Sequence, residues 1–190
     1  MRIFLALLPD DDARQALVAT QGMLAPLLAR GKATPADNLH LTLAFLGELD
    51  EEAVARARMA LHEAASASEP FRIALGGVGA FERRHGSVVW RGIADDEERA
   101  SLMGLQARLA ESLRGRGFDV PYSYVPHMTL FRNARASEGH GLSELQGIVQ
   151  RALPKARFEA SAAHVMLSHH PEGGRLAYDS LFEERLSRTR

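Results

Sequence analysis

The sequence predicts an α+β fold with two lobes, built from antiparallel sheets around a central groove. Two observations lead to this prediction. Short runs rich in Val, Ile, Leu and Phe, which are typical of strands, alternate with longer segments rich in Ala, Leu, Arg and Glu, which are typical of helices. The strand-helix-strand-helix-strand order of the first half then starts again in the second half. We therefore expect one bilobal domain over residues 1–190 with an internal duplication.

The composition fits a globular domain with a sizeable core, because 46% of the 190 residues are hydrophobic and 25% are charged. The formal net charge of -1 excludes a nucleic-acid coat protein that is basic over its whole surface. The absence of cysteine excludes disulfides, a thiol nucleophile and cysteine-ligated metal sites. The apolar run from Ile3 to Leu8 is too short for a signal peptide or a membrane span. We expect a cytoplasmic monomer that needs no membrane and no protein partner.

The first half begins with a strand from Arg2 to Leu8. The acidic residues Asp10 to Asp12 then provide a helix cap and first turn, and the apolar stripe behind them predicts a helix to about Arg30. Pro26 can kink or split this helix. The remaining predicted elements of this half are an extended segment over residues 39–46, a helix over 50–65, and strands over 71–81 and 87–93.

The second half repeats the order with a fixed offset. His40 and His127 lie 87 residues apart, and so do Phe71 and Phe158 and the hairpin tips at Glu82 and His169. The predicted elements are a helix near residues 96–114, an extended segment over 125–131, a helix over 142–153, and strands over 158–167 and 176–182. Two similar halves normally pack about a pseudo-twofold axis, so we expect equivalent residues to face each other across the groove.

The closest repeat between the halves is a histidine motif: His40-Leu41-Thr42-Leu43 is followed by His127-Met128-Thr129-Leu130. Alternate side chains of a strand share a face, so each histidine points the same way as its threonine while the apolar residues point into the core. A single histidine of this kind is usually a packing residue. Two of them at equivalent positions, each beside a hydroxyl, favour a shared chemical site.

Two imidazoles and two hydroxyls across one groove fit displacement at a phosphorus centre. One histidine can accept the proton of the attacking water or hydroxyl while the other donates a proton to the leaving alkoxide. The threonine hydroxyls can donate hydrogen bonds to the non-bridging phosphate oxygens. The spacing alone does not say which histidine is the acid.

The fifth residue after each histidine differs between the halves: Phe45 in the first and Arg132 in the second. A guanidinium grips phosphate and an aromatic ring stacks on a base, so one half is predicted to hold phosphate and the other a nucleobase. An odd offset would put both side chains on the wrong face of a regular strand. The prediction therefore requires each strand to bulge, bend or end after Leu43 and Leu130.

The chain resembles the two-histidine phosphoesterase superfamily, and within it the RNA 2',3'-cyclic phosphodiesterase family once described as 2'-5' RNA ligases. The resemblance is carried by residues 2–7, 38–47, 89–90 and 126–132. It implies a bilobal α+β fold, no metal or other cofactor, and hydrolysis of a terminal 2',3'-cyclic phosphate of RNA to a 2'-phosphate. By this resemblance His40 protonates the ribose O3', His127 activates the water, Thr42, Thr129 and Arg132 bind the phosphate, and Phe45 stacks on the terminal base.

Other functions stay open at this point. A noncatalytic nucleotide- or RNA-binding module could keep the same groove, and an RNA 5'-hydroxyl in place of water would make the enzyme a reversible 2'-5' RNA ligase. His169, His170 and Glu172 could in principle collect a metal ion, but Pro171 and the following glycines favour a hairpin tip. The basic residues at the other predicted tip, 83–85, either attract an RNA backbone or are simply solvated.

Overall fold

The computed structural model describes residues 1–83, 86–138, 141–172 and 174–187, so Arg84 and His85 of the predicted basic tip lie outside the described residues. The described strands are β1 (Arg2–Leu7), β2 (Leu28–Ala33), β3 (Leu41–Glu48), β4 (Phe71–Phe81), β5 (Ser87–Ile93), β6 (His127–Ala136), β7 (Arg157–Ala160), β8 (Ala162–His169) and β9 (Ala177–Arg185). The α-helices are α1 (Asp11–Leu24), α2 (Glu51–Ser66), α3 (Arg99–Gly115) and α4 (Leu145–Val149), and the 3-10 turns are η1 (Ala25–Leu27), η2 (Ala36–Asn38), η3 (Leu142–Glu144) and η4 (Gln150–Ala152).

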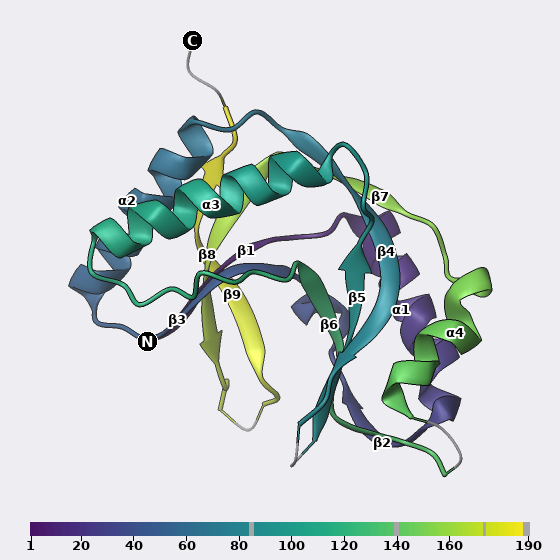
Figure 1. The fold of residues 1–190 in the computed structure, drawn as a ribbon. Coiled ribbons are helices and arrows are strands. Elements are labelled where there is room, and N and C mark those ends of the chain that lie inside the picture. Colours follow the sequence, from purple (N-terminus) through teal and green to yellow (C-terminus); the bar gives the residue numbers. More distant parts are fainter. Residues whose placement is uncertain (84–85, 139–140, 173, 188–190) are drawn as a thin grey trace.

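The described strands form an antiparallel sheet that curls into an open half-barrel (Figure 1). Its order is β7-β4-β5-β6-β3-β1-β8-β9, with β2 added beside β6. Every strand pair in it is antiparallel. The predicted α+β class with antiparallel sheets is therefore confirmed.

Equivalent strands follow one another in the same order on the two sides of the β3–β6 junction. One side continues to β1 and then β8, while the other continues to β5 and then β4. The predicted 87-residue offset would relate these strands to each other: β3 to β6, β1 to β5, and β4 to β8 together with the short β7 that precedes it. The order agrees with an internal duplication, which itself stays a prediction.

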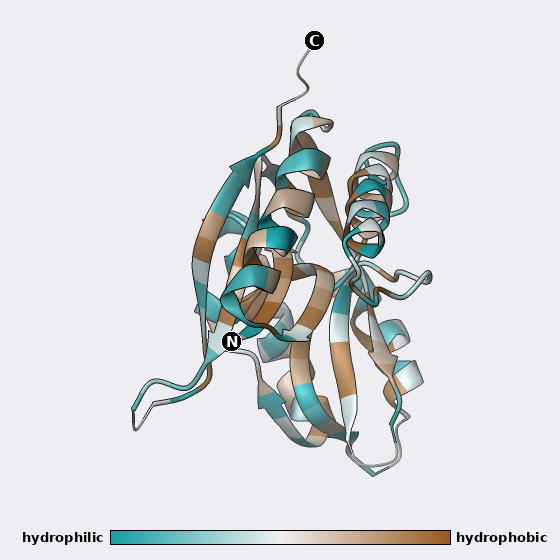
Figure 2. Ribbon diagram, turned by 90° about the vertical axis from the view of Figure 1, so that its left-hand side faces the viewer, coloured by the Kyte–Doolittle hydropathy of each residue, from teal (hydrophilic) through white to brown (hydrophobic). Residues whose placement is uncertain are grey.

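The helices pack in two pairs, one pair on each half of the sheet. Helices α2 and α3 pack together over β3, β8 and β9, and α1 and α4 lie over β4, β6 and β7 (Figure 1). Helix α1 follows β1 but packs on the opposite half, and one large apolar cluster of the described residues extends under these elements. Figure 2 shows the hydrophobic stretches along the strands that make this core. No helix of the described residues is long and apolar enough to cross a membrane.

Two helices begin at the aspartates expected to cap them. The Asp10 carboxylate accepts a hydrogen bond from the backbone N–H of Ala13 at 2.9 Å, and the Asp50 carboxylate accepts one from Ala53 at 2.8 Å. Each bond satisfies a helix N–H that has no partner within the helix, and the negative charge favours the positive end of the helix dipole. The predicted starts of α1 and α2 are confirmed.

Three predicted boundaries are wrong. The first helix does not reach Arg30: it ends at Leu24, because Pro26 cannot donate a backbone hydrogen bond and lies in the turn η1, after which β2 begins. The predicted helix over 142–153 contains only the short α4 between two 3-10 turns. The predicted strand over 158–167 is two strands that break at Ser161, β7 pairing with β4 and β8 with β1.

Arg91 is a buried cation that ties β5 to three other parts of the chain. Its side chain is only 2% exposed. The guanidinium donates to Gly76 O of β4 at 2.5 Å, to Thr20 Oγ1 of α1 at 2.8 Å and to Pro154 O at 2.9 Å. Since charged hydrogen bonds in the interior are stronger than neutral ones, this side chain fixes α1 against the sheet.

We predict that Arg91→Met lowers the free energy of unfolding by about 3 kcal/mol, because the apolar replacement leaves buried acceptors without a donor. Urea denaturation at constant m-value measures the change. Arg72→Met, at an exposed position of β4, is the control and should shift stability by less than about 0.5 kcal/mol. Equal stabilities of the two variants would contradict the role given to Arg91.

Candidate active site

The two histidine motifs meet where the halves of the sheet join. Strands β3 and β6 pair antiparallel at Leu41 and Met128, which are both fully buried. In an antiparallel ladder the flanking residues are then opposite each other, so His40 faces Thr129 and Thr42 faces His127. All four side chains share the face opposite to the buried Leu41 and Met128.

This register puts both imidazoles within reach of one small group. The histidines are diagonal neighbours across the junction, which corresponds to roughly 7 Å between their Cβ atoms. The charge of Arg132, and that of His127 when it is protonated, both lower the pKa of His40, so the three groups are close enough to interact electrostatically. The sequence prediction that both histidines lie over one site therefore agrees with the strand register.

Both strands bulge directly after the threonines. Along β3, Thr42 is opposite Ala6 and Ala44 is opposite Leu5, so Leu43 is an extra residue. Along β6, Thr129 is opposite Trp90 and Phe131 is opposite Val89, which makes Leu130 the extra residue there. Of the three possibilities left open by the sequence, a bulge, a bend or the end of the strand, the structure has a bulge in each strand, at positions 87 residues apart.

The bulges bring the next side chains back to the face of the histidines. After the bulge in β3, Ala44 is buried and Phe45 is 52% exposed, and after the bulge in β6, Phe131 is buried and Arg132 is exposed. Phe45 is not a core aromatic: its ring lies beside the guanidinium of Arg2, 5.3 Å from the ring centroid. Phe45 and Arg132, the fifth residues after the two histidines, are thus both exposed and could contact a ligand.

The two histidines make the same backbone hydrogen bond. His40 Nδ1 lies 2.7 Å from the carbonyl oxygen of Asn38, and His127 Nδ1 lies 2.7 Å from that of Val125. A carbonyl oxygen can only accept, so Nδ1 carries the hydrogen in both rings. Proton transfer to a substrate is therefore left to Nε2 of each histidine.

Each imidazole is also packed between two aromatic rings. The His40 ring lies 4.7 Å from the centroid of Phe4 and 5.2 Å, edge to face, from that of Tyr178. The His127 ring lies 4.9 Å from Phe81 in a T-shaped contact and 6.0 Å from Trp90. These contacts restrict rotation of the imidazoles and exclude water from one side of each.

Burial and a neighbouring cation favour the neutral form of both imidazoles in the free protein. Burial lowers the pKa of His40 to about 4; the bond to Asn38 opposes this, and the charges of Arg132 and His127 lower the pKa further. Burial likewise lowers the pKa of His127, again opposed by its backbone bond and reinforced by Arg132. An anion bound between them would raise both pKa values, because it stabilises the protonated forms.

Several site features could not be found from the sequence. Tyr124 donates a hydrogen bond to the carbonyl oxygen of Thr42 at 3.0 Å, and the buried Asn38 donates to Leu176 O at 2.7 Å, which connects the first motif to the start of β9. Tyr178 reaches His40 from that same strand. None of these contacts follows from spacing along the chain. Trp90, which packs against His127, is different, because it lies in one of the segments that carry the family resemblance.

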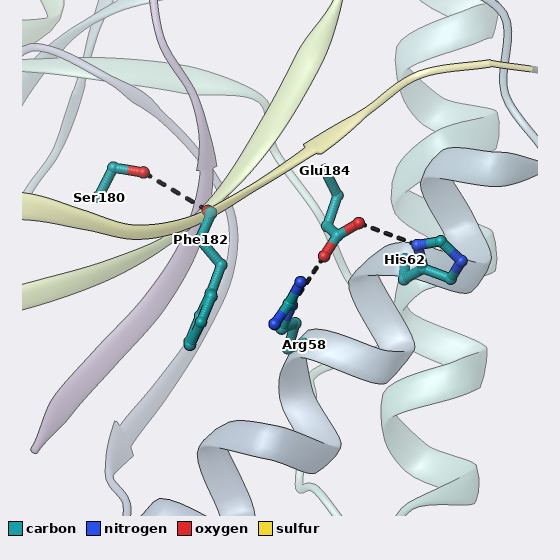
Figure 3. Close-up of polar contacts among 5 residues, drawn as sticks. All are labelled: Arg58, His62, Ser180, Phe182 and Glu184. Carbon is teal, nitrogen blue, oxygen red and sulfur yellow. Dashed lines mark hydrogen bonds and ion pairs between the residues drawn. The ribbon is translucent and has the colours of Figure 1, made fainter.

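A polar cluster of side chains from α2 and β9 forms around Glu184 (Figure 3). Its carboxylate, on β9, accepts hydrogen bonds from Arg58 at 2.9 Å and from His62 at 2.9 Å, both on α2. Burial raises the pKa of Glu184, but these bonds outweigh it and the net shift is downward. Arg58 also lies 4.4 Å from the ring centroid of Phe182. The cluster holds α2 against β9, and it lines a pocket of about 1390 Å³ between α2 and α3 that contains neither motif histidine.

The tip predicted from residues 169–174 forms no metal site in the part of it that is described. His169 Nε2 lies 2.7 Å from a carboxylate oxygen of Asp179 across the β8–β9 pair. No group of three His, Asp or Glu residues within the described ranges is arranged to hold a metal ion.

Comparison with known proteins places this site in a family. The model of the 2'-5' RNA ligase superfamily matches residues 9–172. An RNA 2',3'-cyclic phosphodiesterase of Methanothermobacter thermautotrophicus is 32% identical over 151 residues, which are 79% of this chain and 80% of the relative. Another from Thermus thermophilus is 38% identical over 139 residues, 70% of this chain and 68% of the relative.

Solved structures are similar over almost the whole chain. E. coli LigT in complex with 3'-AMP superposes with a TM-score of 0.75 at 25% identity, covering 98% of each chain. A Thermus thermophilus protein superposes with a TM-score of 0.70 at 25% identity and covers all of both chains. The half-barrel with its paired histidines and the sequence matches lead to one conclusion: the chain belongs to the 2'-5' RNA ligase superfamily.

Proposed function

We propose that the chain is an RNA 2',3'-cyclic phosphodiesterase that opens a terminal cyclic phosphate to a 2'-phosphate without a metal ion. The observation that carries the proposal is the strand register that puts two imidazoles on one face, each with Nδ1 bound to a carbonyl and Nε2 left for chemistry. The relatives that are named RNA 2',3'-cyclic phosphodiesterases support the same reaction.

In the proposed reaction a water oxygen attacks the phosphorus while His127 Nε2 accepts the proton of that water. The bond from phosphorus to the ribose O3' breaks, and His40 Nε2 donates its proton to the departing oxygen. The product carries a 2'-phosphate and a free 3'-hydroxyl. His40 is the more deeply buried ring, which favours the neutral form before substrate binds. The negative charge of the bound phosphate stabilises the protonated imidazole, so His40 takes up a proton from solvent when the substrate binds.

Arg132 and the two threonines are proposed to hold the phosphate. The guanidinium charge acts on both imidazoles, so a phosphate that touches the histidines also lies near Arg132. Thr42 and Thr129 stand opposite the two histidines in the ladder, where their hydroxyls can donate to the non-bridging oxygens. The exposed ring of Phe45 is proposed to stack on the terminal base. Both motifs come from one chain, so a monomer is sufficient.

The two alternatives make different use of the same residues. A reversible 2'-5' RNA ligase would accept an RNA 5'-hydroxyl where the water attacks, and the histidines would keep their roles. A noncatalytic binding module would need donors for the phosphate but no matched acid and base. Two imidazoles with the same tautomer and a common face favour catalysis over binding alone.

Chromatography of the products decides between these functions. We expect the protein to convert a nucleoside 2',3'-cyclic phosphate to the 2'-monophosphate in excess chelator, because imidazoles and not a metal supply the acid and the base. His40→Ala and His127→Ala should each lower kcat by at least about two orders of magnitude. His170→Ala is the control, since it removes an exposed histidine outside the site. A 3'-monophosphate, sensitivity to chelator, or near-normal turnover of either motif variant would contradict the mechanism.

The pKa shifts predict an unusual pH dependence. The kcat/KM profile reports the free enzyme, in which the pKa of both histidines lies below the ordinary value of 6.5. The midpoint of its alkaline limb, where the acid loses its proton, should therefore lie below pH 6.5. The kcat profile reports the complex, where the phosphate raises these values, and its alkaline limb should lie at higher pH. Arg132→Gln removes a charge that lowers both pKa values and should therefore shift the alkaline limb of the kcat/KM profile to higher pH. Coincident limbs in the two profiles would refute this electrostatic account.

A further inference from the structure

The strand pair β2–β6 carries cations directly opposite each other. Lys32 is paired with Arg132, and Arg30 is paired with Arg135. All four side chains are exposed. Like charges directly opposite in an antiparallel pair repel and destabilise it, so this arrangement calls for an anion from outside the strand pair.

The four cations share one face of the sheet. Arg30 and Lys32 are two residues apart on β2, whereas their partners are three residues apart on β6. The extra residue on β6 is absorbed at Asn133, whose φ of 52° is the left-handed conformation that asparagine tolerates. The opposite face of β2 is the core side, where a Cβ on Gly31 would lie 3.3 Å from the buried Phe131 ring.

This basic ladder, defined as Arg30, Lys32, Arg132 and Arg135, starts at the active site and leads away from it. Its first pair contains Arg132, whose charge acts on both histidines. Its second pair lies two residues further along β2, a step of roughly 7 Å. Among the described residues no carboxylate forms an ion pair with any of the four cations.

The far pair of the ladder opens into a pocket with a third arginine. Arg30, Arg135 and Arg83 line a hollow of about 830 Å³. Two carboxylates, Glu82 and Glu138, also line it, so three arginines face two acids among the described residues of this hollow. Arginine suits such a place because its planar fork binds phosphate oxygens through two parallel hydrogen bonds.

We propose that Arg30 and Arg135, with Arg83 beside them, bind the phosphodiester that precedes the terminal nucleotide. The preferred substrate is then an RNA strand with a cyclic phosphate end, and a free nucleoside cyclic phosphate, which lacks this phosphodiester, is hydrolysed less efficiently. This inference rests on the proposed function, because it takes Arg132 to hold the reacting phosphate. Lys32 lies beside Arg132 in the first pair, and the spacing of the two pairs suits successive phosphates of an extended strand.

The test compares kcat/KM for a nucleoside 2',3'-cyclic phosphate with kcat/KM for an oligoribonucleotide that has the same terminal nucleotide. The variant is the double substitution Arg30→Gln with Arg135→Gln. The matched control is Arg151→Gln, which removes an exposed arginine of η4. Melting temperatures of all variants establish that each is folded.

The wild-type protein should prefer the oligonucleotide by about tenfold, and the double variant should lose this preference while its activity on the nucleotide changes less than about twofold. The slope of log kcat/KM against log salt for the oligonucleotide should become shallower by about 0.7 for each phosphate that the variant no longer neutralises. The Arg151→Gln control should retain both the preference and the slope.

Equal losses on the two substrates, or a preference that survives the double substitution, would overturn the inference. A wild-type protein that hydrolyses the nucleotide as well as the oligonucleotide would overturn it too, and would leave the proposed activity intact. Failure to hydrolyse either substrate would instead refute the proposed function itself.

Discussion

The site depends on one strand pairing, that of Leu41 with Met128. This contact closes the sheet between its two halves, and it is the reason that His40 and His127 share a face. A slip of one residue in either strand would turn one histidine motif into the core and its apolar neighbours outward. The fully buried Leu41 and Met128 resist such a slip, because exposing them would cost hydrophobic burial. The core thereby fixes the geometry of the chemistry above it.

The two bulges complete this arrangement. A regular strand would direct Phe45 and Arg132 into the core, and the extra residues Leu43 and Leu130 return them to the face of the histidines. Arg132 then serves two purposes. In the free protein its charge helps to keep both imidazoles neutral, and with substrate bound it stabilises the phosphate that allows one of them to hold a proton.

The sequence predicts those parts of the molecule that local patterns determine. Strand alternation is sufficient to put each histidine beside its threonine, and the odd offset to Phe45 and Arg132 is sufficient to require a bulge. Strand β2 could not be predicted, since residues 28–33 contain small and charged residues instead of the β-branched and aromatic ones typical of strands, and their extended conformation comes with the pairing to β6. For the same reason the contact of Tyr178 with His40 was beyond prediction, because β9 is brought there by the whole sheet.

The central claim is that two imidazoles act on a single bound phosphate with opposite protonation. The most direct measurement is a pH titration of the His40 and His127 ring nitrogens by NMR, with and without a nucleoside 2'-monophosphate. The account predicts that both pKa values lie below 6.5 in the free protein, that the ligand raises them, and that His127→Ala changes the titration of His40. Two histidines that titrate independently, with values that the ligand leaves unchanged, would contradict it.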